Sequence, residues 1–265
     1  MAQQGLILVT GARQRPTPPQ AEQWARKLGG KVVPRQRWSL RELTEQHGAW
    51  GVLVLEADGV VFHVPAEGVS YFYHPGMARR RIKSIMKGFG DPMVTAMDLR
   101  PGDHVLDCTL GRGTDAIIAS FVVGDAGRVV GVEAVPVLAA LTEHGLRTLE
   151  VPQPELQEAM RRVEVVWSDN EEYLAQAEPR SFDVVYFDPL FDRPVEASSA
   201  MVPLRALAEK RPLRREVLEK ARQVARRCVV VKQRRGTPLW EELPPDRVVA
   251  GRKSSVEYGV FAAEA

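Results

Sequence analysis

Residues 105–115 read VLDCTLGRGTD: an apolar run leads into a glycine-rich loop, and a helical pattern follows. Gly111 and Gly113 let the backbone turn tightly and come close to a ligand, and the first turn of the helix offers free N–H groups. A strand, a glycine loop and a helix in this order are typical of a site for a nucleotide-like cofactor. The spacing from Gly111 through Gly113 to Ala116 also satisfies the dinucleotide pattern G-x-G-x-x-A, so the loop alone does not exclude NAD.

Apolar runs and helical patterns alternate from residue 104 onward. Because parallel strands need crossover connections and are buried on both faces, this alternation predicts an α/β fold with a doubly wound, mostly parallel sheet. The last two apolar runs predict an antiparallel closing pair. The predicted strands are residues 104–108, 128–132, 163–167, 182–187 and 228–232, the predicted helices are 115–123, 135–149, 171–177 and 214–226, and the closing pair is 248–249 with 256–261.

The beginning of the chain carries a separate and smaller α/β pattern. Short apolar runs predict strands, two of them joined by a hairpin turn at residues 57–59. Ser39, with Glu42 three residues later, predicts the capped start of a helix. We therefore expect a small N-terminal α/β module over residues 1–70 and a cofactor-binding domain over residues 71–265.

The composition is that of a soluble globular protein: 45% of the 265 residues are hydrophobic and 26% are charged. No apolar stretch approaches the roughly 20 residues that span a bilayer, and the first residues lack the features of a signal peptide. We expect a cytoplasmic protein without a membrane partner. Cys108 and Cys228 lie in separate strand-like runs, which excludes a disulfide framework and a clustered zinc site. We expect no metal.

The formal net charge of +2 hides an uneven distribution. Residues 1–90 hold 13 Lys and Arg against 6 acids, and residues 204–235 hold 12 against 3, whereas residues 91–203 hold 8 against 20. Basic flanks around an acidic centre suit a polyanionic partner, because the basic groups steer phosphates toward a site built from carboxylates. Solvated helix faces would give the same counts, so charge alone favours neither interpretation.

Two carboxylates narrow the choice of cofactor. Glu133 ends the strand after the glycine loop, 20 residues beyond Gly113, where it can accept hydrogen bonds from both ribose hydroxyls. NAD and S-adenosyl-L-methionine share that requirement. Asp107, four residues before Gly111, decides between them, because a carboxylate there would repel a pyrophosphate but attract sulfonium and ammonium groups. We therefore expect S-adenosyl-L-methionine as the cofactor, with S-adenosyl-L-homocysteine as its product.

Residues 183–191, DVVYFDPLF, predict a buried strand that ends in Asp-Pro-Leu-Phe at the same edge of the sheet. Pro189 restricts Asp188 to an extended conformation, and Phe191 can stack on a flat base. An exocyclic amine of a nucleobase is a poor nucleophile because its lone pair is delocalised, and acceptors aimed at its hydrogens favour the attacking geometry. We therefore expect methyl transfer to such an amine, with Asp188, Pro189 and Phe191 as the catalytic residues.

These motifs resemble those of the class I S-adenosyl-L-methionine-dependent methyltransferases. Residues 107–115, Glu133 and residues 188–191 look like motifs I, II and IV of that class, and DPLF resembles the (D/N/S)PP(Y/F) signature of amino-group methylases. The resemblance implies a Rossmann-like class I methyltransferase fold.

A narrower resemblance points to a substrate. Residues 106–116, 132–136, 185–191 and 229–233 are similar to the RsmJ-type 16S ribosomal RNA guanine-N2 methyltransferases, and still more similar to a YpiP-like group of predicted methyltransferases. The similarity covers about residues 72–261. This chain departs from the RsmJ type at Leu190, where that type usually carries Met.

The resemblance and the chemistry together give the candidate site. By the resemblance, Thr114, Asp115, Glu133, Ala134, Asp169, Asn170 and Asp188 line the cofactor pocket, and the chemical argument adds Asp107, Thr109, Gly111 and Gly113. Basic side chains are expected to contact RNA phosphates, and the candidates are Arg79, Arg80, Lys83, Lys232, Arg234 and Arg235.

We therefore expect methylation of an exocyclic base nitrogen in RNA, guanine N2 of small-subunit ribosomal RNA, with 16S rRNA or a small-subunit particle as the partner. Three alternatives remain open at this point. The acceptor could be a protein or a small molecule. The chain could be a non-catalytic RNA-binding protein that retains the cofactor pocket. An NAD-dependent dehydrogenase is disfavoured by Asp107.

Overall fold

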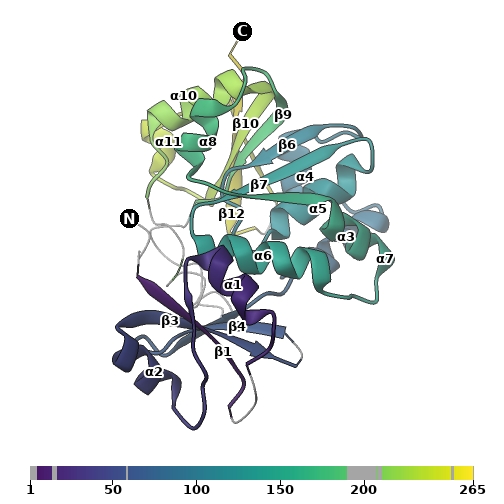
Figure 1. Ribbon diagram of the computed structural model, residues 1–265. Helices are drawn as coiled ribbons and strands as arrows, with labels where there is room; N and C mark the ends of the chain where they lie inside the picture. The colour runs from purple at the N-terminus through teal and green to yellow at the C-terminus, as the bar shows by residue number, and fades with distance from the viewer. Residues whose placement is uncertain are drawn as a thin grey trace.

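Two sheets make up the framework of the protein in a computed structural model that describes residues 5–13, 17–57, 59–189, 207, 211–251 and 254–264 (Figure 1). Five strands form the N-terminal sheet in the order β2-β1-β3-β4-β5, and seven form the larger sheet in the order β11-β12-β10-β9-β6-β7-β8. No helix in these described ranges is long and apolar enough to cross a membrane.

The N-terminal sheet mixes parallel and antiparallel pairs. Strands β2 and β3 flank β1 in parallel, and β4 and β5 continue from β3 as antiparallel hairpins. The predicted capping box is confirmed: the Ser39 hydroxyl accepts from the Glu42 amide, and the Glu42 carboxylate accepts from the Ser39 amide. The elements are β1 (Leu6–Gly11), α1 (Ala21–Leu28), β2 (Lys31–Val32), α2 (Leu40–His47), β3 (Ala49–Glu56), β4 (Gly59–Val64) and β5 (Val69–Phe72).

The larger sheet has the predicted doubly wound topology. Strands β8, β7, β6, β9 and β10 are parallel, and β12 runs antiparallel between β10 and β11. The chain moves outward from β6 to β8 on one side and from β9 to β10 on the other. The strand order therefore reverses beside β6, and such a switch point opens a crevice at the carboxyl ends of the strands. The strands are β6 (His104–Asp107), β7 (Arg128–Glu133), β8 (Val163–Trp167), β9 (Phe182–Phe187), β10 (Ala225–Arg234), β11 (Arg247–Ala250) and β12 (Val256–Ala262).

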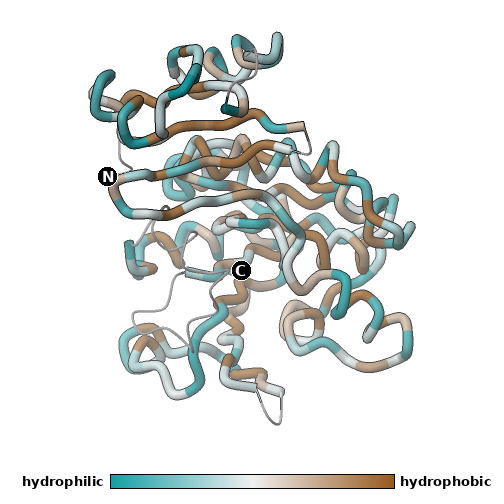
Figure 2. Tube along the Cα trace, turned by 90° about the horizontal axis from the view of Figure 1, so that it is seen from below, coloured by the Kyte–Doolittle hydropathy of each residue, from teal (hydrophilic) through white to brown (hydrophobic). Residues whose placement is uncertain are grey.

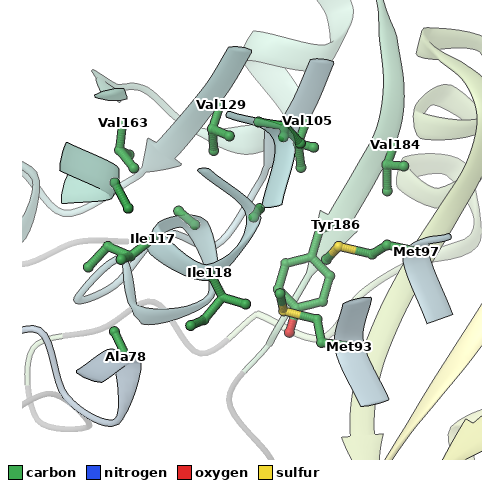
Figure 3. Packing of buried hydrophobic residues seen from close by; sticks show 14 of the residues in the cluster. Ala78, Met93, Met97, Val105, Ile117, Ile118, Val129, Val163, Val184 and Tyr186 are labelled. Carbon is green, nitrogen blue, oxygen red and sulfur yellow. The ribbon is translucent and has the colours of Figure 1, made fainter. Parts of the chain in front are cut away.

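Helices cover both faces of this sheet, so successive residues of a central strand enter opposite cores. In β6, Val105 packs into the cluster under α3, α4, α5 and α7, whereas Leu106 packs into the cluster under α8 and α10. Figure 3 shows the first cluster, where Met93 and Met97 lie beside the Tyr186 ring. The helices are α3 (Ala78–Met86), α4 (Pro92–Met97), α5 (Thr114–Val123), α6 (Pro136–Thr148), α7 (Pro154–Arg162), α8 (Asn170–Gln176), α10 (Arg215–Val224) and α11 (Leu239–Glu242).

The N-terminal sheet shares a hydrophobic cluster with the larger domain. Leu138 and Leu141 of α6 pack with Ile7, Leu53 and Phe62 of the small sheet. Figure 1 shows α1 and α6 between the two sheets, and the tube in Figure 2 is most hydrophobic along the strands. Strand β5 runs to Phe72, so the small sheet continues two residues beyond the module predicted to end at residue 70.

The contact between the N-terminal module and α6 predicts that a side chain at Gly145 of α6 would destabilise the protein. A Cβ atom added there would lie 1.9 Å from a ring carbon of Tyr73. Overpacking of this kind costs about 1–3 kcal/mol, which exceeds the gain of up to about 1 kcal/mol in helix propensity. We expect Gly145→Ala to lower the free energy of unfolding by about 1–2 kcal/mol in urea titrations. Gly90→Ala, where the added atom meets open space, should leave it unchanged.

Candidate active site

The carboxyl ends of four neighbouring strands bring together the charged groups that the sequence placed there. Asp107 ends β6, Glu133 ends β7, Asp188 follows β9, and Lys232 lies in β10. Because β7, β6, β9 and β10 are adjacent and parallel, these side chains meet at one edge of the sheet. The glycine-rich loop between β6 and α5 lies at the same edge.

The glycine loop has the backbone conformation that its residues predict. Gly111 and Gly113 have φ angles of 52° and 70°, a region that L side chains rarely adopt. Gly113 is the N-cap of α5, and no side chain among the described residues caps that helix. Its first N–H groups therefore remain available to a ligand with negative charge.

Glu133 connects the loop to the next strand. Its Oε2 accepts a hydrogen bond from the Gly111 amide (3.0 Å), and its Oε1 accepts from the Val135 amide (2.9 Å). The Thr142 hydroxyl of α6 donates to the Gly111 carbonyl (2.7 Å). Ala134 follows Glu133 and is half-buried. These bonds hold the loop and the carboxylate in one fixed arrangement.

Asp107 is a buried carboxylate, 2% exposed, and no cationic side chain in the described ranges pairs with it. Its Oδ1 accepts from the amide (3.0 Å) and the hydroxyl (3.4 Å) of Thr109. Burial raises the pKa of Asp107 to about 8, and the neighbouring charges of Asp115 and Asp188 add to the rise. The site therefore contains a carboxyl group whose ionised form has no counter-ion among the described side chains.

Thr109 also holds the end of β9. Its hydroxyl oxygen accepts a hydrogen bond from the Asp188 amide (2.6 Å), so the two candidate acids are joined through one side chain. Pro189 is half-buried directly after Asp188. Phe191 and Leu190 lie outside the described residues.

Asp115 is the centre of an ionic cluster that the sequence did not predict. Its carboxylate accepts from Lys232 Nζ (3.0 Å), from the Tyr186 hydroxyl (2.8 Å) and from the Arg81 guanidinium. Burial opposes ionisation, but Lys232 and Arg81 hold the pKa of Asp115 well below its usual range. The sequence feature that could have indicated an inward-facing Arg81 is its position three residues after Ala78, because this spacing places both residues on one face of α3, and Ala78 is buried.

Asp169 and Asn170, which are two of the residues predicted to line the cofactor pocket, lie beside the same edge. The Asp169 carboxylate caps α8 by accepting from the Glu171 amide (2.8 Å), and it pairs with the Arg211 guanidinium. The Asn170 side-chain amide donates to the Cys108 carbonyl (3.3 Å) at the start of the glycine loop. Burial opposes ionisation of Asp169, but Arg211 and the helix amides lower its pKa.

The predicted RNA-contacting residues separate into two groups. Arg79, Arg80 and Lys83 are exposed on α3, and Arg234 and Arg235 are exposed at the end of β10. In contrast, the ammonium group of Lys232 lies between two carboxylates of the site. This placement differs from the predicted contact of Lys232 with RNA phosphate.

The segment after β5 contacts the start of α5. His74 Nε2 lies 3.1 Å from the Arg112 guanidinium of the glycine loop, and the Thr114 hydroxyl donates to the Pro75 carbonyl (3.4 Å). Gly76 has a φ of 59°, and a Cβ atom on it would lie 2.6 Å from Thr114 Oγ1. The chain leaving the N-terminal module is thus part of the wall around the glycine loop.

Comparison with known proteins assigns the chain to a family. Residues 37–261 match the model of a family described as SAM-dependent methyltransferases, where SAM is S-adenosyl-L-methionine. The chain belongs to this family. It is 43% identical over 196 residues to the uncharacterized protein YpiP of Bacillus subtilis (strain 168), which covers 74% of this chain and 76% of that protein.

Two further matches bear on the family and the fold. The chain is 34% identical over 224 residues to ribosomal RNA small subunit methyltransferase J of Laribacter hongkongensis, covering 81% of this chain and 74% of that protein. A solved SAM-dependent methyltransferase from Neisseria gonorrhoeae has a TM-score of 0.62 at 20% identity, covering 98% of this chain and 96% of that one. The match confirms the Rossmann-like methyltransferase fold.

The protein is therefore a SAM-dependent methyltransferase, and the charges of the site fit that cofactor. SAM carries a sulfonium, an ammonium and a carboxylate group. Among the described residues no cation pairs with the buried Asp107 and no side chain caps the N-terminus of α5, and these two groups lie at the two ends of one short loop. Glu133 lies on the other side of that loop. A pyrophosphate would bring two further negative charges toward Asp107, so the donor set favours SAM over NAD.

We expect the affinity for SAM to increase with pH. Below about pH 8 Asp107 is protonated, and a cation that binds beside it favours the charged form, so binding releases a proton. Affinity should therefore rise by up to roughly tenfold per pH unit and level off above about pH 8. Calorimetric titration of the wild type and of Asp107→Asn, from about pH 6 to 9, measures this effect. Protonation of SAM itself affects both proteins equally, so it cancels when the dissociation constant of the variant is divided by that of the wild type at each pH. A ratio that does not change with pH would contradict the prediction.

Proposed function

We propose that this methyltransferase modifies an exocyclic nitrogen of an RNA base, namely guanine N2 in small-subunit ribosomal RNA. The observation that carries the proposal is the Asp188-Pro189 pair, which follows β9 at the carboxyl edge of the sheet and is joined to Asp107 through Thr109. The kinship to relatives named ribosomal RNA small subunit methyltransferase J supports RNA as the acceptor and ribosomal RNA as its source.

We assign the cofactor roles by chemical type. Glu133 receives the ribose hydroxyls, and Asp107 faces the cationic groups. The free N–H groups of the α5 N-terminus, with Thr114, face the methionine carboxylate. Asp115 lines the pocket from the first turn of α5, where Lys232 and Arg81 compensate its charge. Ala134, Asp169 and Asn170 line the adenine end. In this assignment Thr109, Gly111 and Gly113 shape the loop that holds these groups in place.

The residues of this chain then orient the acceptor. SAM supplies an electrophilic methyl group on a positively charged sulfur. The Asp188 carboxylate and the Pro189 carbonyl accept hydrogen bonds from the amine, which turns its lone pair toward the methyl carbon. A nitrogen–carbon bond forms while the sulfur–carbon bond breaks, the positive charge moves to nitrogen, and the extra proton passes to water. Phe191 is proposed to stack on the base.

The exposed face of α3 supports a polyanionic acceptor. Arg79, Arg80 and Lys83 are exposed there, and Met86 and Phe89 at the end of the helix are 53% and 65% exposed. Cations beside exposed apolar side chains suit single-stranded RNA, because phosphates pair with the cations and unpaired bases pack on the apolar groups. A base inside a duplex would have to leave its stack before it reached Asp188.

Transfer of labelled methyl from SAM tests the function. Purified protein is offered total RNA and total protein from a strain that lacks the gene, and labelled RNA is digested to nucleosides. We expect labelled N2-methylguanosine. Label in protein alone would overturn the RNA acceptor while leaving the family and the cofactor in place, and a labelled N6-methyladenosine would overturn guanine N2.

Asp188→Asn tests the proposed site. The variant keeps the shape of the side chain and one acceptor oxygen but loses the negative charge, so we expect methylation to fall by about tenfold while SAM binding remains measurable. Asp125→Asn removes a carboxylate whose side chain is 90% exposed and serves as the matched control. Equal rates for the Asp188→Asn variant and the wild type would refute the role of this carboxylate.

The α3 surface predicts the salt dependence of RNA binding. Replacing Arg79, Arg80 and Lys83 by Gln removes three cations, so the slope of log affinity against log salt should become shallower by about 2. Fluorescence anisotropy with a labelled single-stranded RNA measures this change.

The matched control replaces three exposed cations of the N-terminal module, Arg26, Lys31 and Arg37, by Gln. We expect this control to keep the wild-type slope. Identical slopes for both triple variants would place the RNA surface elsewhere.

A further inference from the structure

Lys232 places its ammonium group between two carboxylates of the site. Its Nζ lies 2.7 Å from Asp188 Oδ2 and 3.0 Å from Asp115 Oδ2, and the side chain is 20% exposed. The residue lies in β10, which pairs with β9 on one side and with β12 on the other. Both neighbours are strands of the sheet, so the backbone that carries Lys232 is fixed.

Asp115 is itself held in place, which keeps Lys232 in one position. The Tyr186 hydroxyl and the Arg81 guanidinium donate to Asp115, and Arg81 binds both oxygens of Asp91 (2.8 and 2.9 Å). Positive and negative groups therefore alternate from Asp91 through Arg81, Asp115 and Lys232 to Asp188. Asp91 in turn caps α4 by accepting from the Met93 amide (3.0 Å).

Only one oxygen of Asp188 is engaged by this chain of charges. Lys232 binds Oδ2, and no described residue donates to Oδ1. An ionised carboxylate is an acceptor at both oxygens, whereas a protonated one carries a hydrogen that would oppose an amine hydrogen. The ionised form of Asp188 therefore favours the acceptor geometry proposed for methyl transfer, because its free oxygen then carries no hydrogen.

The surroundings of Asp188 oppose that ionisation. Burial raises its pKa, the Lys232 ammonium lowers it, and the Asp115 charge raises it again. The same two carboxylates raise the pKa of Lys232 against its own burial, so the ammonium stays charged. Without the lysine, the buried Asp115 and the half-buried Asp188 would face each other, with Arg81 as the remaining cation among the described residues, and one of the two carboxylates would take up a proton.

We propose that Lys232 is a positioning residue of the methyl-transfer site: it holds Asp188 ionised and turned so that its free oxygen receives the acceptor amine. This inference rests on the proposed function for the identity of the acceptor. It also assigns the lysine to the reactive carboxylate and not to RNA phosphate. Lys232 acts through Asp188 and does not itself touch the reacting atoms.

The kinetic test compares Lys232→Met with Lys232→Arg. The methionine variant keeps the length of the side chain without its charge, so the pKa of Asp188 should rise, and kcat near pH 7 should fall by roughly tenfold for each unit by which that pKa exceeds the pH. Raising the pH should restore kcat, and the KM for RNA should stay within about twofold. Lys232→Arg keeps the charge and should retain most of the activity at neutral pH.

Lys31→Met, which removes an exposed lysine of β2, is the matched control and should behave as wild type. A merely structural role for Lys232 would lower activity equally at every pH, and a phosphate contact would raise the KM for RNA at unchanged kcat. Either result overturns the proposal.

A second measurement needs no acceptor. In protein labelled with ¹³C at the aspartate carboxyl groups, the Asp188 signal is assigned by its loss in Asp188→Asn, and its titration is followed by NMR. We expect a higher midpoint in Lys232→Met than in the wild type or in Lys232→Arg. An unchanged midpoint refutes the role of Lys232. If the wild-type protein methylates no RNA, the proposed function fails, while this titration still decides whether Lys232 controls Asp188.

Discussion

Charge compensation inside a low-dielectric crevice is the constraint on which the site depends. Asp115 is 8% exposed, and a carboxylate at such a position is stable only with cations and donors around it. Those partners come from α3, β9 and β10, so the ionic cluster also fixes where these elements end relative to α5. Removing one of these partners would leave the buried charge of Asp115 uncompensated. The packing of α3, β9 and β10 against α5 and the ionisation of the site therefore depend on the same contacts.

The glycine loop solves a different problem at the same edge. A ligand with both cationic and anionic groups needs a carboxylate and a set of free amides a few residues apart, and a side chain on the loop would hold the ligand away from both. Gly113 provides this by capping α5 in a left-handed conformation, while Thr109 fixes Asp107 on one side and the Asp188 amide on the other. Only the doubly wound topology brings β6 and β9, whose first residues are 78 positions apart in the chain, into contact.

Patterns that depend on neighbours along the chain could be predicted from the sequence. The alternating apolar runs gave the parallel strands and the antiparallel β12, and Ser39 with Glu42 gave the start of α2. The partners of Lys232 could not be predicted, because its contacts with Asp115 and Asp188 span 117 and 44 residues and depend on the packing of β10 against β9. Helices α4, α7 and α11 also escaped prediction, because each is short and begins at or directly after a proline that resembles a turn signal.

Helix α3 carries arginine side chains on both of its faces, one exposed to solvent and the other directed into the site. Arg79 and Arg80 face solvent, where salt screens charges beyond about 8 Å at physiological ionic strength. Arg81 is turned inward to Asp91 and Asp115, where water is excluded and screening is weak. Ionic strength should therefore change the affinity for a polyanion and leave the ionisation of Asp91, Arg81 and Asp115 unchanged. The outer face of α3 thus serves acceptor binding, whereas its inner face serves the charge state of the site.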